Sequence, residues 1–164
     1  MILITVGVSN LPFDRLVSAA DGLTAEGEEV VAQYGAARVR PQRAVNVDYV
    51  PFAELREWVA QARVVVCHAG IGSVALCLSH GKHPVVVPRL QRFGEAVDEH
   101  QLAFARRLGE LGLASAVEDV GELARAVRSV PAGQPRTGLS RQLADELLAY
   151  IGSVRAGQDS YESG

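Results

Sequence analysis

The chain has 164 residues, of which 48% are hydrophobic and 21% charged, and its formal net charge is −3 at pH 7. This length is the size of one domain, and this composition can bury a core. The charge balance, with no dense basic run, excludes nucleic acid as a main partner. No apolar run approaches the roughly 20 residues that a membrane-spanning helix needs.

The N-terminal residues and the cysteines indicate the compartment. The opening MILITVGVSN has no basic region and is too short for a signal peptide, so we expect it to form a strand. Cys67 and Cys77 do not indicate a disulfide framework. We therefore expect a cytoplasmic protein.

The N-terminal part of the chain alternates strand and helix patterns. Ile2 to Val6 is an apolar run typical of a strand, and Pro12 suits the first turn of the helix that follows. Residues at helical spacing give that helix one buried face: Phe13, Leu16, Val17, Ala20 and Leu23. The patterns then predict a strand over 29–33, a loop over 36–46, a short strand over 47–52 that ends near Pro51, and a helix over 52–62.

The segment from Val64 to Pro88 predicts a strand, a loop, a helix and a second strand. Valines at 64–66 run into Cys67 and His68, small residues form a turn over 69–73, and a helix-length run covers 74–80. Gly81 ends this helix, and a buried strand follows over 85–87. This order is typical of a βαβ unit.

The remaining patterns predict a polar loop over 89–96, a helix from about Asp98 to Leu111 that ends at Gly112, a strand over 114–117, and a helix over 120–130 capped by Asp119. Residues 131–138 have a linker composition. An amphipathic helix over 139–151 either packs on this domain or docks on a partner. We expect one domain over 1–152 and a flexible tail over 153–164. The alternation predicts an α/β fold, a Rossmann-like three-layer domain with a parallel sheet.

The loop over 68–73 is the strongest candidate site in the sequence. It joins the end of a parallel strand to the start of a helix, where α/β sheets bind ligands. Unpaired N–H groups and the positive end of the helix dipole favour a phosphate there. Gly70 and Gly72 lack a Cβ and allow close approach, while His68 and Ser73 add polar groups. The pattern favours a diphosphate-bearing ligand over a tight turn with a structural role alone.

Three other features have simpler structural explanations. Gly7 and Ser9 follow the first strand, either as an ordinary turn or as a second contact to the diphosphate. Cys67 is expected in the core rather than as a nucleophile, because neighbours on a strand point to opposite faces. His80 and His83 flank a turn with no carboxylate at metal-ligand spacing, so we expect no metal site.

Four segments in order resemble a known family. They are ILITVGVSNLPFDRLV, VCHAGIGS, GKHPVVVPRLQRFGE and DEHQ. Together they resemble the nucleotide-sugar-binding half of GT-B glycosyltransferases, of the family 28 C-terminal domain type, over about Ile2 to Val130. Within this type the chain is similar to two stand-alone subunits. One is the small subunit of bacterial two-component exopolysaccharide glycosyltransferases, and the other is the catalytic subunit of the eukaryotic N-acetylglucosaminyltransferase that acts on a lipid-linked sugar.

The resemblance implies a single GT-B C-terminal-type domain that binds a UDP-sugar donor. The donor-binding residues would be Gly7, Ser9, His68, Ala69, Gly70, Ile71, Gly72, Ser73, Arg89, Glu95, His100 and Gln101. Val50 and Phe52 lie where the family binds the base. The catalytic residue is not identified, with His68 and His100 as candidates, and no metal or other cofactor is implied. For Arg89, a solvated surface position is the alternative.

The resemblance also implies the activity. A GT-B enzyme needs two Rossmann-like halves and this chain holds one, so a membrane-associated partner chain would bind the acceptor. The pair would transfer the sugar with inversion to a lipid-linked glycan at the cytoplasmic face of the membrane, in exopolysaccharide or cell-surface polysaccharide synthesis. The alternative is a non-catalytic nucleotide-sugar-binding or regulatory subunit. A nicotinamide-dinucleotide domain is disfavoured because GxGxxG spacing is absent after the first strand.

One residue departs from the family pattern. Three positions past Ser73 the family usually has an acidic residue that holds the ribose hydroxyls, and here Leu76 occupies that position. A leucine cannot accept these hydrogen bonds. Either another group such as Glu95 holds the ribose, or donor affinity is low, or the chain has lost catalysis.

Overall fold

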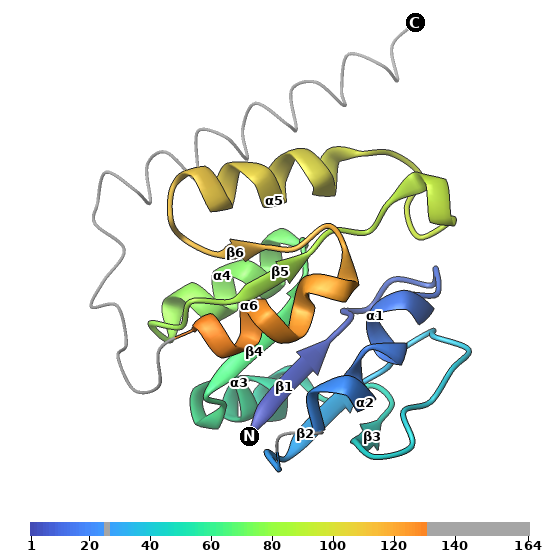
Figure 1. The fold of residues 1–164 in the computed structure, drawn as a ribbon, viewed down its shortest axis with the longest axis vertical. Coiled ribbons are helices and arrows are strands. Elements are labelled where there is room, and N and C mark those ends of the chain that lie inside the picture. The colour runs from blue at the N-terminus through green and yellow to red at the C-terminus, as the bar shows by residue number, and fades with distance from the viewer. Residues whose placement is uncertain (25–26, 131–164) are drawn as a thin grey trace, which may run out of the picture.

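The computed structural model describes residues 1–24 and 27–130 (Figure 1). Its elements in chain order are β1 (Ile2–Thr5), α1 (Asp14–Ser18), α2 (Ala20–Leu23), β2 (Val30–Gln33), β3 (Val45–Val47), α3 (Phe52–Gln61), β4 (Val64–His68), α4 (Ile71–Ser79), β5 (Val85–Val87), η2 (Gln91–Phe93), α5 (His100–Glu110), β6 (Ser115–Ala116), η3 (Val120–Glu122) and α6 (Leu123–Ser129). The helix predicted over 139–151 and the tail predicted over 153–164 lie outside the described residues.

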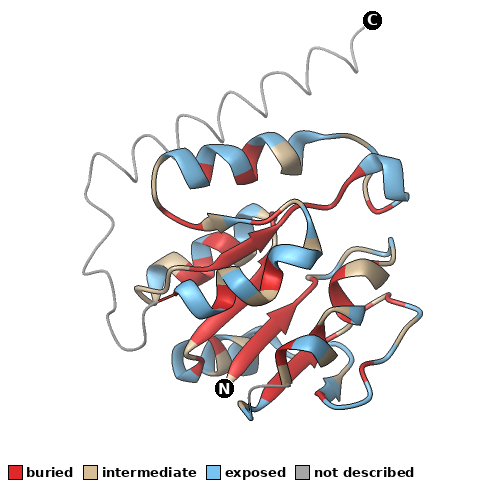
Figure 2. Ribbon diagram, in the orientation of Figure 1, coloured by how far each residue is buried: buried red, intermediate tan, exposed pale blue. Residues whose placement is uncertain are grey.

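Six strands form one parallel sheet in the order β3-β2-β1-β4-β5-β6. β1 lies in the interior of the sheet, where Ile2 pairs with Val30 of β2 on one side and with Val64 of β4 on the other. The central strands are buried on both faces, as the red ribbons in Figure 2 show, which explains their continuous apolar runs. The sheet confirms the predicted α/β, Rossmann-like class.

Helices cover both faces of the sheet and produce three layers (Figure 1). Successive strand residues point to opposite faces, so each strand contributes to two cores. Ile4 and Val66 belong to a core with α1, α2 and α6, whereas Leu3 and Cys67 belong to a core with α3, α4 and α5. Cys67 is fully buried, which confirms its predicted place in the core.

The third strand is the largest difference from the sequence prediction. It covers Val45–Val47 rather than 47–52. It is an edge strand whose first two residues are exposed, so its sequence lacks the apolar run that marks a buried strand. Pro51 has an extended backbone and is the N-cap of α3, which keeps 48–51 outside both elements.

Helix boundaries also differ by a few residues. The helix predicted over 74–80 begins at Ile71, because Gly70 is the extended N-cap and the turn after β4 is correspondingly short. α5 begins at His100 rather than near Asp98. The helix predicted from Pro12 to Leu23 is divided into α1 and α2, and the one predicted over 120–130 begins with the 3-10 turn η3.

Two predicted helix ends are confirmed. Gly112 has a φ of 64°, the left-handed conformation that ends a helix, and the amide of Leu113 donates to the carbonyl of Leu108 at 2.9 Å. Asp119 caps the next helical segment by accepting a 2.8 Å hydrogen bond from the amide of Gly121.

Candidate functional site

The candidate site lies where the chain changes direction within the sheet. From β1 the chain adds β2 and β3 on one side, and it then adds β4, β5 and β6 on the other side. In open α/β sheets, ligands bind in the crevice at the carboxyl ends of the two strands that meet at such a point, which here are β1 and β4. The turns that follow these two strands carry Gly7, Ser9 and the segment 68–73, so the fold brings the two predicted segments together.

The imidazole ring of His68 occupies a slot between two glycines. A Cβ built on Gly7 would lie 2.4 Å from Cε1 of His68, and one built on Gly70 would lie 2.1 Å from Nε2 of the same ring. Gly7 also has a φ of 74°, a conformation that residues with a side chain rarely adopt. Both glycines are therefore required for the ring to lie at the end of β4.

The environment of His68 keeps its imidazole neutral. Burial, and secondarily the positive charge of Arg89, lowers the pKa of His68 to about 4. The Nδ1 atom is buried and has no hydrogen-bond partner among the described residues. A buried polar atom without a partner is unfavourable and marks either a water or a ligand contact. The ring is thus a neutral polar group at the base of the crevice.

The start of α4 offers unpaired backbone donors beside this ring. No side chain caps the helix, and its first hydrogen bond runs from the amide of Val74 to the carbonyl of Gly70 at 3.0 Å. The amides of Ile71, Gly72 and Ser73 precede that bond and have no acceptor within the helix. A Cβ on Gly72 would meet nothing within 4 Å, so this glycine faces open space. The arrangement suits an anion that approaches the backbone closely.

The turn after β1 is held by buried polar side chains that the sequence analysis did not identify. The side-chain carbonyl oxygen of Gln33 accepts hydrogen bonds from the hydroxyl of Thr5 (2.8 Å) and the amide of Val6 (3.1 Å). Its amide nitrogen donates to the carbonyl of Gly7 at 3.2 Å. Polar residues at the ends of two buried strands were the available signal. Ser9 closes the turn by accepting from the amide of Leu11 at 3.2 Å.

Arg89 and Glu95 lie in the interior rather than facing a ligand. Arg89 is 2% exposed, and its guanidinium donates to backbone carbonyls of the loops after β1 and β5. The carboxylate of Glu95 pairs with Arg15 at 2.9 Å and accepts from the amide of Leu90 at 3.1 Å. The direct donor contact expected of Arg89 and Glu95, and a ribose contact from Glu95, would require these groups to turn outward. The solvated alternative for Arg89 is wrong, because the side chain is buried.

His100 and Gln101 begin α5 beside the loop after β5. His100 is exposed and its Nδ1 pairs with the carboxylate of Asp98, whose Oδ1 also accepts from the amide of His100 at 3.1 Å. This contact agrees with a helix-start role for Asp98. The side-chain oxygen of Gln101 accepts from the amide of Arg89 at 3.2 Å, so it links α5 to the end of β5.

Val50, Phe52 and Leu76 differ in what they offer a ligand. Val50 and Phe52 follow β3, a strand that is separated from β4 by three strand spacings, about 14 Å in a sheet of this kind. Phe52 is 68% exposed. Leu76 is buried in the core formed with α3, α4 and α5, so the position that would hold a ribose faces apolar side chains.

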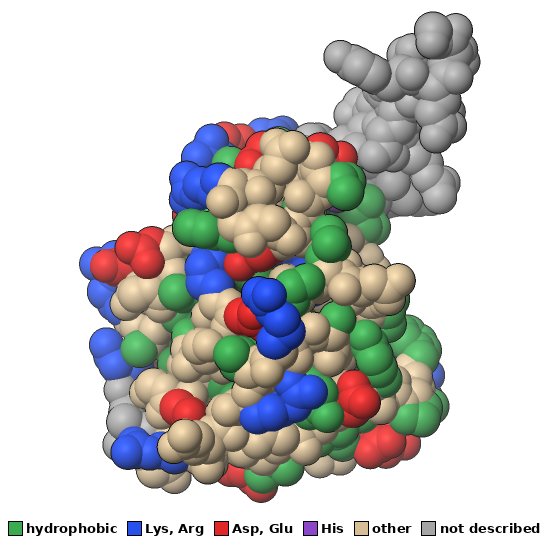
Figure 3. All heavy atoms as spheres, turned by 90° about the vertical axis from the view of Figure 1, so that its right-hand side faces the viewer, with side chains coloured by type: hydrophobic (Ala, Val, Ile, Leu, Met, Phe, Trp, Pro, Cys, Tyr) green, Lys and Arg blue, Asp and Glu red, His purple; other side chains and the backbone are tan. Residues whose placement is uncertain are grey.

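Exposed apolar side chains gather at the same edge of the sheet. Large exposed hydrophobics on segments that follow strands β1, β3, β4 and β5 are, among the described residues, Val8, Leu11, Tyr49, Phe52, Ile71, Phe93 and Val97. The side of the molecule with the loops after β1 and β5 mixes such groups with arginines and carboxylates (Figure 3).

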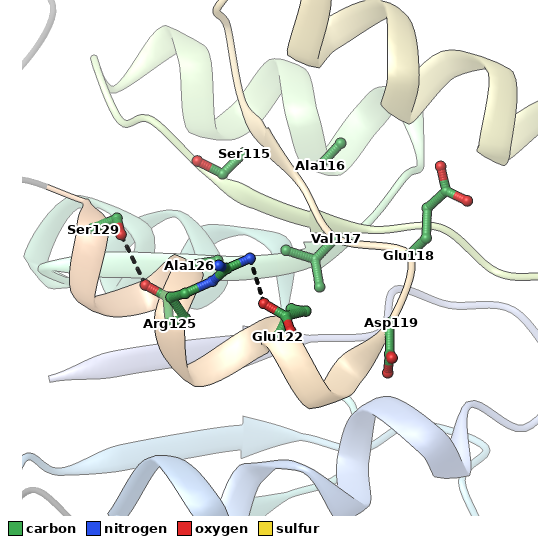
Figure 4. Close-up of a pocket in the computed structure, with 9 residues that line it drawn as sticks. All are labelled: Ser115, Ala116, Val117, Glu118, Asp119, Glu122, Arg125, Ala126 and Ser129. Atoms are coloured by element: carbon green, nitrogen blue, oxygen red, sulfur yellow. Dashed lines mark hydrogen bonds and ion pairs between the residues drawn. The ribbon is translucent and has the colours of Figure 1, made fainter.

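A separate hollow of about 470 Å³ lies between β6 and α6 (Figure 4). Its charged groups are mostly acidic, since Glu118, Asp119 and Glu122 line it, and its arginine, Arg125, pairs with Glu122. Glu118 extends instead to Arg106, at 2.7 Å. An acidic hollow repels a phosphate, so it does not compete with the start of α4 as a nucleotide site.

The described part of the chain shows neither a cluster of metal ligands nor a helix suited to span a membrane. Within residues 1–24 and 27–130, no group of three or more His, Cys, Asp or Glu side chains is placed to hold a metal ion. Within the same residues, no helix combines the length and apolar character needed to span a membrane.

Comparisons with known proteins identify the family of this chain. The model of the glycosyltransferase family 28 C-terminal domain matches residues 1–142. The chain is 28% identical over 124 residues to the UDP-N-acetylglucosamine transferase subunit ALG13 of Yarrowia lipolytica, covering 66% of this chain and 60% of that protein. It is 36% identical over 61 residues to the UDP-N-acetylglucosamine--N-acetylmuramyl-(pentapeptide) pyrophosphoryl-undecaprenol N-acetylglucosamine transferase of Rhodospirillum rubrum, covering 37% of this chain and 15% of that protein.

A solved structure with the same fold is the calicheamicin glycosyltransferase CalG4. It has a TM-score of 0.62 and is 21% identical, and the match covers 98% of this chain but 42% of that protein. The chain therefore spans less than two thirds of each of these relatives, and this structural match shows the fold.

Proposed function

Because the chain belongs to the glycosyltransferase family 28 C-terminal domain family, we propose that it binds a UDP-sugar and acts as the donor-binding subunit of a glycosyltransferase. The observation that carries the proposal is the start of α4, where unpaired amides and the open space at Gly72 follow Gly70, which packs against the imidazole of His68. A diphosphate bound there would meet those amides and the positive end of the helix dipole. Both curated relatives are named for UDP-N-acetylglucosamine, which supports a UDP-sugar.

The proposed reaction breaks the bond between the anomeric carbon of the sugar and the diphosphate. The acceptor oxygen attacks from the opposite side of the sugar, so the anomeric configuration inverts. Negative charge grows on the departing UDP, and preorganised amides at the start of α4 stabilise it, an effect that typically contributes about 10²–10³ in kcat per donor. His68, neutral at pH 7, contributes a polar contact without adding a charge.

A general base must remove the proton of the acceptor hydroxyl. On this chain His100 is the exposed candidate, since the carboxylate of Asp98 lies against its Nδ1 and orients the ring. A residue of the partner chain is the other source.

We extend the proposal to the partner and the location. The partner is a membrane-associated chain that binds a lipid-linked glycan at the cytoplasmic face, in exopolysaccharide or cell-surface polysaccharide synthesis, and the reaction uses no metal or other cofactor. Two observations support a partner: exposed apolar side chains lie on the loops at this edge of the sheet, and the Yarrowia relative is named a subunit.

Calorimetric titration with UDP, UDP-glucose, UDP-glucuronic acid and NADH tests the donor site. We expect the chain to bind the UDP compounds and not NADH. Gly72→Trp fills open space at the start of α4 and should abolish that binding without unfolding the protein. Ala103→Trp, at an exposed position of α5, is the matched control and should bind as wild type does. UDP binding that survives in Gly72→Trp would place the donor elsewhere.

The buried Leu76 favours a second candidate function, a non-catalytic nucleotide-sugar-binding or regulatory subunit, because this position offers no oxygen to a ribose. Turnover of a UDP-sugar by the chain with its co-expressed partner would exclude this candidate. Binding without turnover in that complex would favour it.

A further inference from the structure

The guanidinium of Arg89 is a buried cation that mainly contacts backbone. Its Nη1 donates to the carbonyls of Leu11 (2.9 Å), Pro12 (3.4 Å) and Glu95 (3.3 Å), and its Nη2 donates to the carbonyl of Val6 at 3.0 Å. The guanidinium carbon lies 4.6 Å from the ring centroid of Phe13. Burying a charge is unfavourable unless it is well paired, so a cation here constrains the carbonyls that surround it.

Those carbonyls flank the turn that borders the candidate site. Val6 and Leu11 lie on either side of the segment that carries Gly7 and Ser9. Arg89 holds this segment from the β5 side of the sheet, while Gln33 holds Val6 and Gly7 from the β2 side. β1 lies between β2 and β4, with β5 beyond β4, so the side chain of Arg89 spans the width of the crevice.

The position of this turn decides whether His68 fits. Gly7 forms one wall of the slot, and a Cβ there would lie 2.4 Å from the ring, so the slot leaves little tolerance for movement of the Gly7 backbone. Releasing the carbonyls of Val6 and Leu11 would let the turn shift against or away from the imidazole. The geometry of the donor site therefore depends on Arg89, whose buried side chain holds the turn by its backbone carbonyls.

We propose that Arg89 is a positioning residue of the donor site, which fixes the turn after β1 against the imidazole of His68 through the carbonyls of Val6 and Leu11. The proposal rests on the proposed function for the location of the donor, and it replaces a direct donor contact by Arg89 with an indirect one. Arg15 ties Glu95 to the neighbouring loops, since its guanidinium donates to the carboxylate of Glu95 and to the carbonyls of Pro88 and Glu118.

The test compares Arg89→Met and Arg89→Lys with the control Arg92→Met, an exposed arginine of the following loop. Two quantities are measured on the folded chains: the affinity for UDP by calorimetry, and the backbone amide chemical shifts of Gly7 and Val8 by NMR. In the complex with the partner chain, KM for the UDP-sugar, KM for the acceptor and kcat are measured as well.

We expect Arg89→Met to weaken UDP binding by about tenfold or more and to move both amide signals, because its apolar side chain donates no hydrogen bond. Arg89→Lys should recover part of the affinity, since an ammonium can hold one carbonyl but lacks the planar fork that reaches both Val6 and Leu11. In the complex, KM for the UDP-sugar should rise while KM for the acceptor stays constant. The control should stay within about twofold of wild type.

The outcomes separate this proposal from the one on which it rests. A folded Arg89→Met with wild-type affinity and unmoved Gly7 and Val8 signals would overturn it. If Arg89→Met does not fold, Arg89→Lys decides, because wild-type affinity with unmoved signals in that variant also overturns the proposal. If wild type binds no UDP compound, the donor assignment fails, and the amide shifts alone still decide whether Arg89 fixes the turn.

Discussion

Two halves of the candidate site use glycine for opposite reasons. In the packed half, Gly7 and Gly70 face the ring of His68, and neither has room for a Cβ. In the open half, Gly72 faces space in which a Cβ would contact nothing within 4 Å. The packed half therefore fixes the shape of the crevice, whereas the open half leaves room for a ligand. The same residue type in one short loop carries a structural requirement at position 70 and a binding requirement at position 72.

Gly7→Ala is expected to have the largest effect on stability. It combines the cost of a side chain at positive φ, about 1–2 kcal/mol, with overpacking against His68, about 1–3 kcal/mol. The free energy of unfolding, measured with urea, should fall by about 2–5 kcal/mol. Gly94→Ala is the matched control, because Gly94 has a φ of 68° but faces open space. Equal losses in the two variants would contradict the packed slot.

Gly70→Ala should have the next largest effect, a loss of about 1–3 kcal/mol from overpacking alone, since Gly70 has an ordinary φ. Removal of the ring in the double variant Gly70→Ala/His68→Ala should reduce the penalty of the added methyl, which a double-mutant cycle measures. Gly22→Ala is the control for the change of residue type, because a Cβ on Gly22 would contact nothing within 4 Å. An additive cycle would show that the methyl and the ring do not meet.

The pH dependence of stability should report the buried ring. The pKa of His68 is lowered to about 4, against an ordinary value of 6.5, so only the unfolded chain takes up this proton between those two pH values. Stability is therefore full above pH 6.5 and is lost as the pH falls towards 4, at up to about 1.4 kcal/mol per pH unit. Wild type should lose more stability than His68→Gln between pH 6.5 and 4.5. An NMR titration in which His68 protonates near pH 6.5 would refute this.

Gly72→Ala should have the smallest effect on stability, and the effect has the opposite sign. Gly72 lies in α4 with space for a methyl, so alanine should stabilise the protein by about 0.4–1 kcal/mol by restricting the unfolded chain. The same methyl stands between the backbone and a bound phosphate, so UDP affinity should fall. If Gly72→Ala destabilises the protein as much as Gly70→Ala does, the distinction between a packed half and an open half of the site is wrong.

The sequence predicts the parts of the molecule that local patterns determine. The valines of β4 and β5 and the glycines between them identify the βαβ unit, because a buried parallel strand needs a continuous apolar run. β3 was placed incorrectly because Val45 and Asn46 are exposed and carry no such pattern. The family and the fold were predicted from the order of the four motifs and are confirmed.

The orientation of charged residues near the site was harder to predict. Arg89 and Glu95 follow a strand end, as ligand-binding residues do, and nothing in the local sequence distinguishes a loop-holding arginine from a phosphate-binding one. Their burial depends on the loop after β1, which the pairing of distant strands brings over them. Gln33 and Arg15 were missed for the same reason, since each acts on a segment far away in the sequence.

The pairing of β1 with β4 has a consequence for how the chain folds. Ile2 lies beside Val64, so the central strand of the sheet gains its second neighbour after most of the chain's first half has been synthesised. Parallel pairings at such separation are slow to form, because a long loop must close first. The slot for His68 is made from the ends of these two strands and assembles only in that step. Folding of the core and assembly of the crevice should therefore be one kinetic event.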